Sequence, residues 1–244
     1  MLRKDGRSNK EPRKTNILHN IQEYAEGSVL IEVGATKIIC AVSIENTVPL
    51  FLRSTGKGWI TAEYSMLPRS THTRTQRESS SRPKGRSQEI QRLIGRSLRA
   101  ITDLSMIGER TIYIDCDVLQ ADGGTRTAAI TGSYVALQKA FSKMILEKTL
   151  EYSPLKSQLA AVSVGIVSGN LLLDLCYEED SIADVDMNIV MTHKHEIIEI
   201  QGTAEQAPFS IDTANEMIQL GAKGIDYLVD IQNTALTNSE KFRL

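Results

Sequence analysis

Apolar and polar side chains alternate along several stretches of the chain, and a period of two predicts β-strands with one buried face. Over residues 111–118 the even positions are apolar, whereas positions 113, 115 and 117 carry tyrosine and two aspartates. The same pattern predicts two hairpins, one of strands 28–33 and 37–44 and one of strands 160–167 and 171–177. It also predicts single strands at residues 59–64, 187–192 and 197–201.

Three segments instead repeat apolar residues every three or four positions, which predicts helices with one buried face. The first helix is expected to begin near Ser87 and to stop at Gly108, since glycine commonly ends a helix. The second follows residue 125 and extends to about residue 145, and the third runs from Asp212 toward Val229.

Polar segments separate and flank these elements. Residues 1–20 are basic and polar and are predicted to be irregular, whereas residues 69–87 and the acidic stretch 178–186 are predicted to be loops. Residues 237–244 form a polar C-terminal tail that is expected to fray. Because no repeat or linker divides the chain, we expect a single α+β domain over residues 1–236, with mixed sheet and three main helices.

The 244-residue chain has an ordinary globular composition, with 41% hydrophobic and 24% charged residues. Its three cysteines include no CxxC pair, which predicts core thiols in a reducing compartment rather than disulfides or a zinc site. The first 13 residues are too polar for a signal peptide, and the longest apolar tract, 159–176, is interrupted by Gly169 and Asn170. We therefore expect a cytoplasmic protein without a membrane partner.

Charge is segregated along the chain. Basic residues dominate positions 53–99, whereas acidic residues dominate positions 174–216, in which Lys194 is the only lysine or arginine. Since the net charge is only −2, binding to a nucleic acid requires a local basic patch of this kind. A basic surface beside an acidic cluster is what a metal-dependent enzyme acting on a polyanion requires, although solvated surfaces are also often biased in charge.

The turn at residues 123–126, Gly-Gly-Thr-Arg, links the strand at 111–118 to the second helix. Glycines allow backbone amides to approach a ligand, and the first turn of a helix leaves amides unpaired, so the turn and Arg126 predict a phosphate or sulfate site. Arg86 precedes another helix and could hold the same phosphate from a second side. The turn is neither a Walker A loop nor a dinucleotide fingerprint, and the local pattern leaves a purely structural turn open.

Asp180 and Asp186 are predicted to lie in and at the end of one loop between strands. Mg²⁺ and Mn²⁺ commonly take one or two carboxylates together with substrate phosphate, so this pair is a candidate metal site. The alternative is a solvated acidic turn, and Asp115 and Asp117 on the strand before the glycine turn are rival carboxylates.

Several longer runs resemble the ribonuclease PH family, the phosphate-dependent exoribonucleases of bacteria. These runs occur in order across residues 3–236: Asp5-Gly6-Arg7, Ala25-Glu26-Gly27-Ser28-Val29-Leu30, Gly58-Trp59-Ile60-Thr61-Ala62-Glu63-Tyr64, Met66-Leu67-Pro68-Arg69, Glu89-Ile90-Gln91-Arg92-Leu93-Ile94-Gly95-Arg96, Asp115 to Arg126, Glu179-Asp180-Ser181, Asp186-Met187-Asn188, and Gln201-Gly202-Thr203-Ala204-Glu205.

The resemblance implies two related β–α units with mixed sheets, helices packed between them, and a homo-hexameric ring built as a trimer of dimers. It implies a phosphate site at Arg86 with Gly124-Thr125-Arg126, and a metal site at Asp180 and Asp186. These four charged residues are the expected catalytic groups. Arg69, Arg74 and Arg77 match arginines of the family that contact tRNA or hold the ring together. The basic region 69–99, which also contains Arg92, Arg96 and Arg99, is expected to bind the rest of the RNA.

The expected reaction is attack by inorganic phosphate on the last linkage of an RNA 3′ end, with precursor tRNA as substrate and Mg²⁺ or Mn²⁺ as cofactor. It releases nucleoside 5′-diphosphates and should run backward when these are abundant. Two alternatives are a catalytically silent RNA-binding subunit of a ring and a metal-dependent hydrolytic exonuclease. The retained aspartates and arginines favour the phosphorolytic enzyme.

Overall fold

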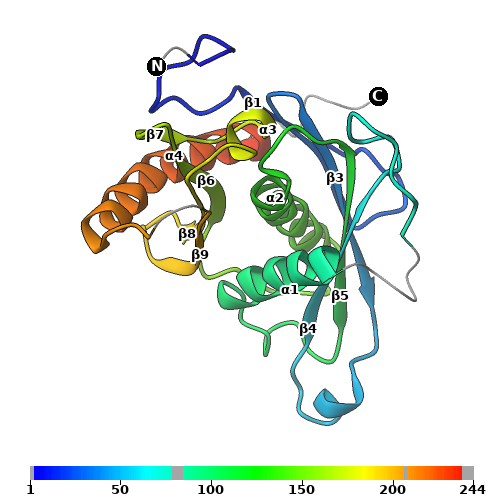
Figure 1. Cartoon of the computed structure of the whole chain (residues 1–244). Coiled ribbons are helices and arrows are strands. Elements are labelled where there is room, and N and C mark those ends of the chain that lie inside the picture. The colour runs from blue at the N-terminus through cyan, green and yellow to red at the C-terminus, as the bar shows by residue number, and fades with distance from the viewer. Residues whose placement is uncertain (1–2, 79–84, 206–207, 238–244) are drawn as a thin grey trace.

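The structure is a computed structural model that describes residues 3–78, 85–205 and 208–237. Its elements form two sheets with a long helix between them (Figure 1). The strands of the first sheet are β1 (Thr15–His19), β2 (Gly27–Val33), β3 (Thr36–Glu45), β4 (Trp59–Met66) and β5 (Thr111–Gln120). Those of the second sheet are β6 (Leu159–Val167), β7 (Asn170–Leu173), β8 (Val185–Thr192) and β9 (Ile197–Ala204).

The helices are α1 (Gly85–Ala100), α2 (Thr125–Leu146), the single turn α3 (Tyr177–Asp180) and α4 (Ile211–Thr237), and η1 (Leu50–Leu52) is a short 3₁₀ turn. The first sheet has the order β1-β2-β3-β5-β4, in which only β4 and β5 pair in parallel. The second has the antiparallel order β7-β6-β8-β9.

The helix α2 is the centre of the molecule. It packs against β2 and β3 of the first sheet and against β6 of the second, and most of its side chains are buried. The strand β6 is buried on both faces, because α2 covers one face and α4 the other. One apolar cluster therefore contains residues from both sheets, such as Val29 and Val190.

The main expectations from the sequence are confirmed. The model is an α+β arrangement of two sheets with three long helices, and the hairpins at 27–44 and after residue 159 are present. The strand that precedes the glycine turn and the helix that follows it are present as β5 and α2. The single domain over residues 1–236 stays a prediction.

Several boundaries predicted from the sequence are wrong. The first helix ends at Ala100 and not at Gly108, because the chain beyond it pairs with a distant segment: the Asp103 amide donates to the Pro154 carbonyl at 2.8 Å. Gly108, with φ of 67°, instead forms the turn before β5. The strand after Gly169 ends at Leu173 rather than at 177, because Asp174 has φ of 54° and turns the chain.

The ends of the chain are more regular than predicted. Part of the segment 1–20 forms β1, which pairs with β2. The acidic stretch 178–186 is not one loop, since Asp180 closes the helical turn α3 and Asp186 belongs to β8. The last helix continues to Thr237, and the rest of the predicted tail, 238–244, lies outside the described residues, as do positions 79–84 of the predicted loop 69–87.

Candidate active site

The glycine turn between β5 and α2 has a conformation that other residues adopt poorly. Gly123 and Gly124 have φ of 74° and 64°, in the left-handed region that favours glycine. A Cβ added to Gly123 would lie 2.7 Å from the Leu175 carbonyl oxygen, so the turn also packs directly against the backbone that leads into α3. Gly124 is the N-cap of α2 and has no capping side chain, which leaves the first amides of the helix available to a ligand.

Side chains behind the turn fix its backbone. The Thr36 hydroxyl donates to the Gly123 carbonyl at 2.7 Å and accepts from the Asp122 amide at 2.9 Å. Arg13 donates to the Asp122 carbonyl, and its guanidinium is held by Asp174, with Nη2 to Oδ1 at 2.7 Å and Nε to Oδ2 at 3.0 Å. Because Arg13 and Asp174 are both buried, the turn rests on a fixed ion pair.

All six residues expected to bind phosphate or metal line one cavity of about 960 Å³. They are Arg86, Gly124, Thr125, Arg126, Asp180 and Asp186. They come from α1, from the start of α2, and from α3 and β8 of the second sheet, so the cavity lies between the two β–α units. The sequence therefore predicted correctly which distant segments meet.

Arg126 is held in the cavity mainly by a neutral partner. Its Nη1 donates to the Gln201 side-chain oxygen at 2.9 Å, whereas the nearest Glu89 oxygen is 3.5 Å away. The Arg126 side chain is only 17% exposed, whereas Arg86 is exposed at the start of α1. The pair therefore offers an anion one partly buried positive charge, fixed by a hydrogen bond, and one exposed positive charge.

Asp180 and Asp186 form the negative part of the same cavity. Partial burial raises the pKa of Asp180, and the nearby arginines Arg86 and Arg126 lower it only in part. Burial, followed by the charge of Asp180, raises the pKa of Asp186. In the part of the chain that the structure describes, neither aspartate forms an ion pair within 4 Å. Carboxylates whose ionised forms are disfavoured in this way are stabilised by an added cation.

The donor set fits a cation that completes its shell with water and substrate oxygens. A search of the described residues finds no group of three or more His, Cys, Asp or Glu side chains that could hold a metal ion. Mg²⁺ commonly takes only one or two carboxylates and keeps several waters, so two aspartates facing one cavity are sufficient for it.

The sequence reasoning missed several polar residues of the cavity. Asn188 is two positions from Asp186 on β8, and both therefore face the same side of the sheet. Gln201 is the register partner of Asn188 on β9, and it holds Arg126. Both residues stand in family motifs, to which no role was assigned for them. Period-two alternation along β8 could also have identified Asn188, whereas no local pattern indicates the role of Gln201.

The N-terminal segment was also missed. Arg3 is buried and donates to both oxygens of Glu179, at 2.7 and 2.6 Å, and to the Leu173 and Asp174 carbonyls. The Cys176 amide donates to the same glutamate at 3.0 Å. These bonds hold the turn α3, which carries Asp180. No pattern near Arg3 indicates this contact, since its partners are more than 165 residues away.

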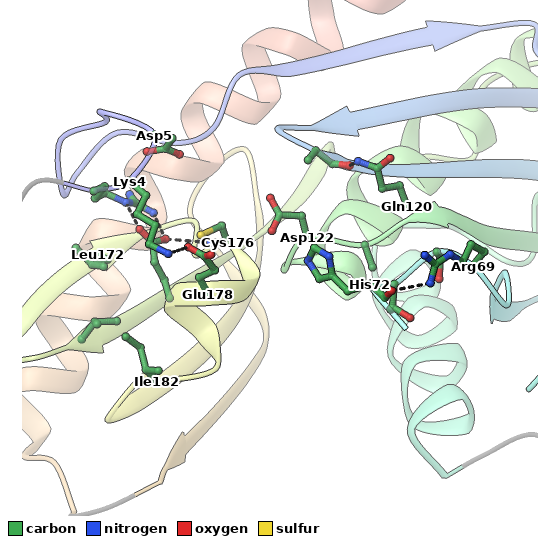
Figure 2. Close-up of a pocket in the computed structure, with 17 residues that line it drawn as sticks. Lys4, Asp5, Arg69, His72, Gln120, Asp122, Leu172, Cys176, Glu178 and Ile182 are labelled. Atoms are coloured by element: carbon green, nitrogen blue, oxygen red, sulfur yellow. Dashed lines mark hydrogen bonds and ion pairs between the residues drawn. The ribbon is translucent and has the colours of Figure 1, made fainter. Parts of the chain in front are cut away.

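The arginines expected to bind RNA do not line this cavity. Arg69 lines a second cavity of about 710 Å³ (Figure 2). The two cavities are neighbours, since Ile182 lines both of them. In Figure 2, Arg69, His72 and Asp122 lie on one side of this space, and Lys4, Cys176 and Glu178 on the other.

The other five lie elsewhere on the first unit. Arg92 is exposed on α1, and Arg96 of the same helix forms two hydrogen bonds with Glu199. Arg99 lies 4.3 Å from the centre of the Trp59 ring and donates to the Ile60 carbonyl. Arg74 and Arg77 are exposed in the segment after β4.

The rival carboxylates, Asp115 and Asp117, lie outside the cavity that contains Asp180 and Asp186, on the face of β5 that points away from α2. Burial, followed by the charge of Glu63, raises the pKa of Asp115, whereas Arg77 partly offsets the effect of burial on Asp117. Their position separates them from the glycine turn, so the structure favours Asp180 and Asp186 as the carboxylates that act with it.

A cavity that keeps arginines and a helix N-terminus apart from two carboxylates can hold an anion and a cation side by side. That is the requirement of an enzyme that transfers a phosphoryl group between two anionic reactants. The fold and the site thus define a phosphoryl-transfer enzyme of α+β architecture.

Comparison with known proteins identifies the family. Residues 11–142 match the model of the 3′ exoribonuclease family, domain 1, and residues 157–224 match domain 2 of the same family. The chain therefore belongs to the 3′ exoribonuclease family. This membership confirms the activity expected from the sequence, that of a phosphorolytic 3′→5′ exoribonuclease.

Individual relatives agree over nearly the full length. The chain is 58% identical to a ribonuclease PH of Dehalococcoides mccartyi, over 96% of this chain and 98% of that protein. It is 56% identical to a ribonuclease PH of Moorella thermoacetica, over 97% of this chain and 95% of that protein.

Solved structures share the fold at low sequence identity. Rice (Oryza sativa) Rrp46 has a TM-score of 0.78 at 20% identity, over 96% of this chain and 100% of that chain. An Archaeoglobus fulgidus exosome with RNA bound to the active site has a TM-score of 0.75 at 24% identity, over 99% of this chain and 92% of that chain. These matches confirm the predicted fold.

Proposed function

We propose that the chain trims the 3′ end of precursor tRNA, using inorganic phosphate held by Arg86, Arg126 and the amides around Gly124 and Thr125. The observation that carries this proposal is the single cavity that contains these groups together with two carboxylates that lack ion-pair partners among the described residues. The arginines stay available to an anion because Arg126 is held by Gln201 rather than by either aspartate.

In the proposed reaction an oxygen of inorganic phosphate attacks the phosphorus of the last linkage. A new P–O bond forms while the bond from phosphorus to the 3′ oxygen of the preceding nucleotide breaks, and that oxygen takes up a proton. The products are a nucleoside 5′-diphosphate and an RNA shortened by one nucleotide. The reverse reaction adds a nucleotide from a diphosphate, because the bonds formed and broken are of comparable energy.

The repulsion between two anions is a large part of the barrier, so charge stabilisation and positioning are the main contributions of the protein. Arg86 and Arg126 neutralise the incoming phosphate, while Asp180 and Asp186 would hold Mg²⁺ or Mn²⁺. When bound, such an ion supplies positive charge at the phosphate of the RNA terminus. The turn amides orient the attacking phosphate.

The remaining RNA is proposed to lie along the basic surface of the first unit. Arg69, Arg74, Arg77 and Arg92 are exposed there and would contact RNA phosphates or a neighbouring subunit. Arg96 and Arg99 already contact Glu199 and Trp59, so we propose that they contribute positive charge rather than a direct contact.

The proposed assembly is a homo-hexamer arranged as a trimer of dimers, located in the cytoplasm. Its support is the family membership and the fold shared with subunits of an archaeal exosome core, which matches with a TM-score of 0.75 at 21% identity. In the described parts of the chain, no helix combines the length and the apolar character needed to cross a membrane.

The test is phosphate dependence. The purified protein is incubated with 3′-labelled RNA and Mg²⁺, with and without inorganic phosphate, and the released mononucleotide is identified. Nucleoside diphosphate that appears only with phosphate is the expected result. Release of monophosphate without phosphate would replace the proposal with a hydrolytic exonuclease, and no release on precursor tRNA would leave the silent ring subunit.

A further inference from the structure

Tyr64 connects the first sheet to the N-terminus of α2. Its ring is buried in the core between β4 and α1, with 2% of the residue exposed. Its phenol oxygen donates a hydrogen bond to Thr125 Oγ1 at 2.8 Å. Thr125 lines the catalytic cavity, whereas Tyr64 does not. The phenol therefore forms a hydrogen bond with the side chain of a residue that lines the cavity.

The direction of this hydrogen bond follows from the chemistry of the two groups. A phenol, with a pKa near 10, is a stronger donor than an aliphatic alcohol, so Tyr64 donates and Thr125 accepts. Burial raises the pKa of Tyr64 further, and the Thr125 bond and the charge of Arg86 offset this only in part, so the phenol keeps its proton at neutral pH.

A threonine hydroxyl has one proton to donate, and accepting a bond from Tyr64 leaves that proton free. Thr125 Oγ1 donates to no other group in the residues that the structure describes. The oxygen is thus fixed by Tyr64, while its own proton has no acceptor among the described residues. A hydroxyl that accepts one hydrogen bond also becomes a better donor in the next, because the two bonds polarise each other.

We propose that Tyr64 is a positioning residue that orients the Thr125 hydroxyl so that it donates its proton to an oxygen of inorganic phosphate. This inference rests on the proposed function, in which phosphate binds at residues 124–126. Tyr64 touches neither reactant and acts only through Thr125. The arrangement adds a neutral, directed donor to the charges of Arg86 and Arg126, so that the phosphate is held in one orientation.

The first variant is Tyr64→Phe, which removes one oxygen and leaves the ring in place. Loss of a buried hydrogen bond is worth about 1 kcal/mol, which corresponds to roughly a fivefold change in an equilibrium constant. We therefore expect the KM for phosphate to rise roughly three- to tenfold, with kcat changed by less than about twofold. Rates are measured against phosphate concentration at saturating RNA, well below the melting temperature of each variant.

Tyr134→Phe is the matched control. Tyr134 is also buried, on α2, and its phenol is near Gln158 rather than the turn. This variant loses a buried phenol oxygen but should keep the wild-type KM for phosphate. A purely structural role for Tyr64 would make the two variants behave alike.

A double-mutant cycle tests whether Tyr64 acts through Thr125. Thr125→Val keeps the shape and branching of the side chain but removes its hydroxyl, and it should raise the KM for phosphate at least as much as Tyr64→Phe. Adding Tyr64→Phe to Thr125→Val should then raise this KM no further. Two effects that multiply would show that the residues act independently and would overturn the proposal.

Failure of the inference is distinguishable from failure of the proposed function. A wild-type enzyme without phosphate dependence would remove the proposed function itself. A phosphate-dependent wild type with an unchanged KM in Tyr64→Phe, or with equal rises in Tyr64→Phe and Tyr134→Phe, would overturn the role of Tyr64 alone.

Discussion

The ion pair between Arg13 and Asp174 should stabilise the fold and the phosphate site together, and Asp174→Asn tests both effects. Asp174 accepts three hydrogen bonds from Arg13, from its backbone amide, Nε and Nη2, at 2.8, 3.0 and 2.7 Å. The two side chains are only 4% and 6% exposed. Neutralising the aspartate therefore leaves a guanidinium buried without its counter-charge.

Removal of one partner from a buried ion pair destabilises a protein by about 3–5 kcal/mol. For a chain of this length, each kcal/mol lowers the melting temperature by roughly 2–4 °C, so Asp174→Asn should melt roughly 6–20 °C lower. The KM for phosphate should also rise, by roughly tenfold, because Arg13 then holds the Asp122 carbonyl and the glycine turn less firmly. Thermal unfolding and phosphorolysis rates at a temperature below both transitions measure the two effects.

Two further variants make this test specific. Glu32→Gln removes the exposed ion pair with Lys37, whose side chains are 26% and 43% exposed, and should change stability by less than about 1 kcal/mol. Arg13→Met combined with Asp174→Asn removes both buried charges and keeps a residue that tolerates the φ of 54° at position 174, so it should recover part of the stability, but not the KM for phosphate. Wild-type melting of Asp174→Asn would refute the energetic reasoning, and reduced stability with an unchanged KM would refute the link to the phosphate site.

Other variants test the remaining parts of the cavity. Gly123→Ala should lower the free energy of unfolding by about 1–3 kcal/mol and move the turn, because a Cβ at φ of 74° would clash with the Leu175 carbonyl. A lower melting temperature and a higher KM for phosphate would show these two effects. Arg126→Ala should weaken phosphate use far more than RNA binding, and a gel shift that fell equally would contradict its role. Asp180→Asn should abolish turnover while the ring still assembles, as size-exclusion chromatography would show. Because the pKa values of Asp180 and Asp186 are raised, activity should begin to fall on the acidic side at a pH above the ordinary aspartate range. In metal-free protein, the free energy of unfolding should decrease as pH rises from that range to the raised pKa values, because the folded state then binds more protons than the unfolded state. Asp186→Asn should make this pH dependence of the unfolding free energy weaker.

Those parts of the site that depend on local pattern were predictable from the sequence. The strand, glycine turn and helix at residues 111–146 follow from alternation, glycine chemistry and helical period, each of which is read within a few residues. The family motifs added which distant segments meet. Tertiary contacts decided the end of α1, where the apolar period continues past Ala100 but the chain pairs with the segment near Pro154.

The contacts of the N-terminal segment could not be predicted in this way. Arg3 and Arg13 look like solvated charges in the sequence, because nothing nearby marks them as buried. Their partners Glu179 and Asp174 are 176 and 161 residues away. Asp186 was assigned to the end of a loop because the predicted strand was taken to begin at Met187, whereas β8 begins at Val185 and one of its faces borders the polar cavity.

The neutral contact between Arg126 and Gln201 explains how opposite charges coexist in one cavity before any ligand arrives. If Arg126 paired with Asp180 or Asp186, the two charges would neutralise each other, and an incoming phosphate would first have to separate them. Gln201 instead fixes the guanidinium by a 2.9 Å hydrogen bond without reducing its charge. Burial raises the pKa of both aspartates, and the charge of Asp180 raises that of Asp186 further, so a bound cation would stabilise their ionised forms. Gln201→Glu should reduce phosphate use, because it would give Arg126 a second carboxylate at hydrogen-bond distance, in addition to Glu89 at 3.5 Å.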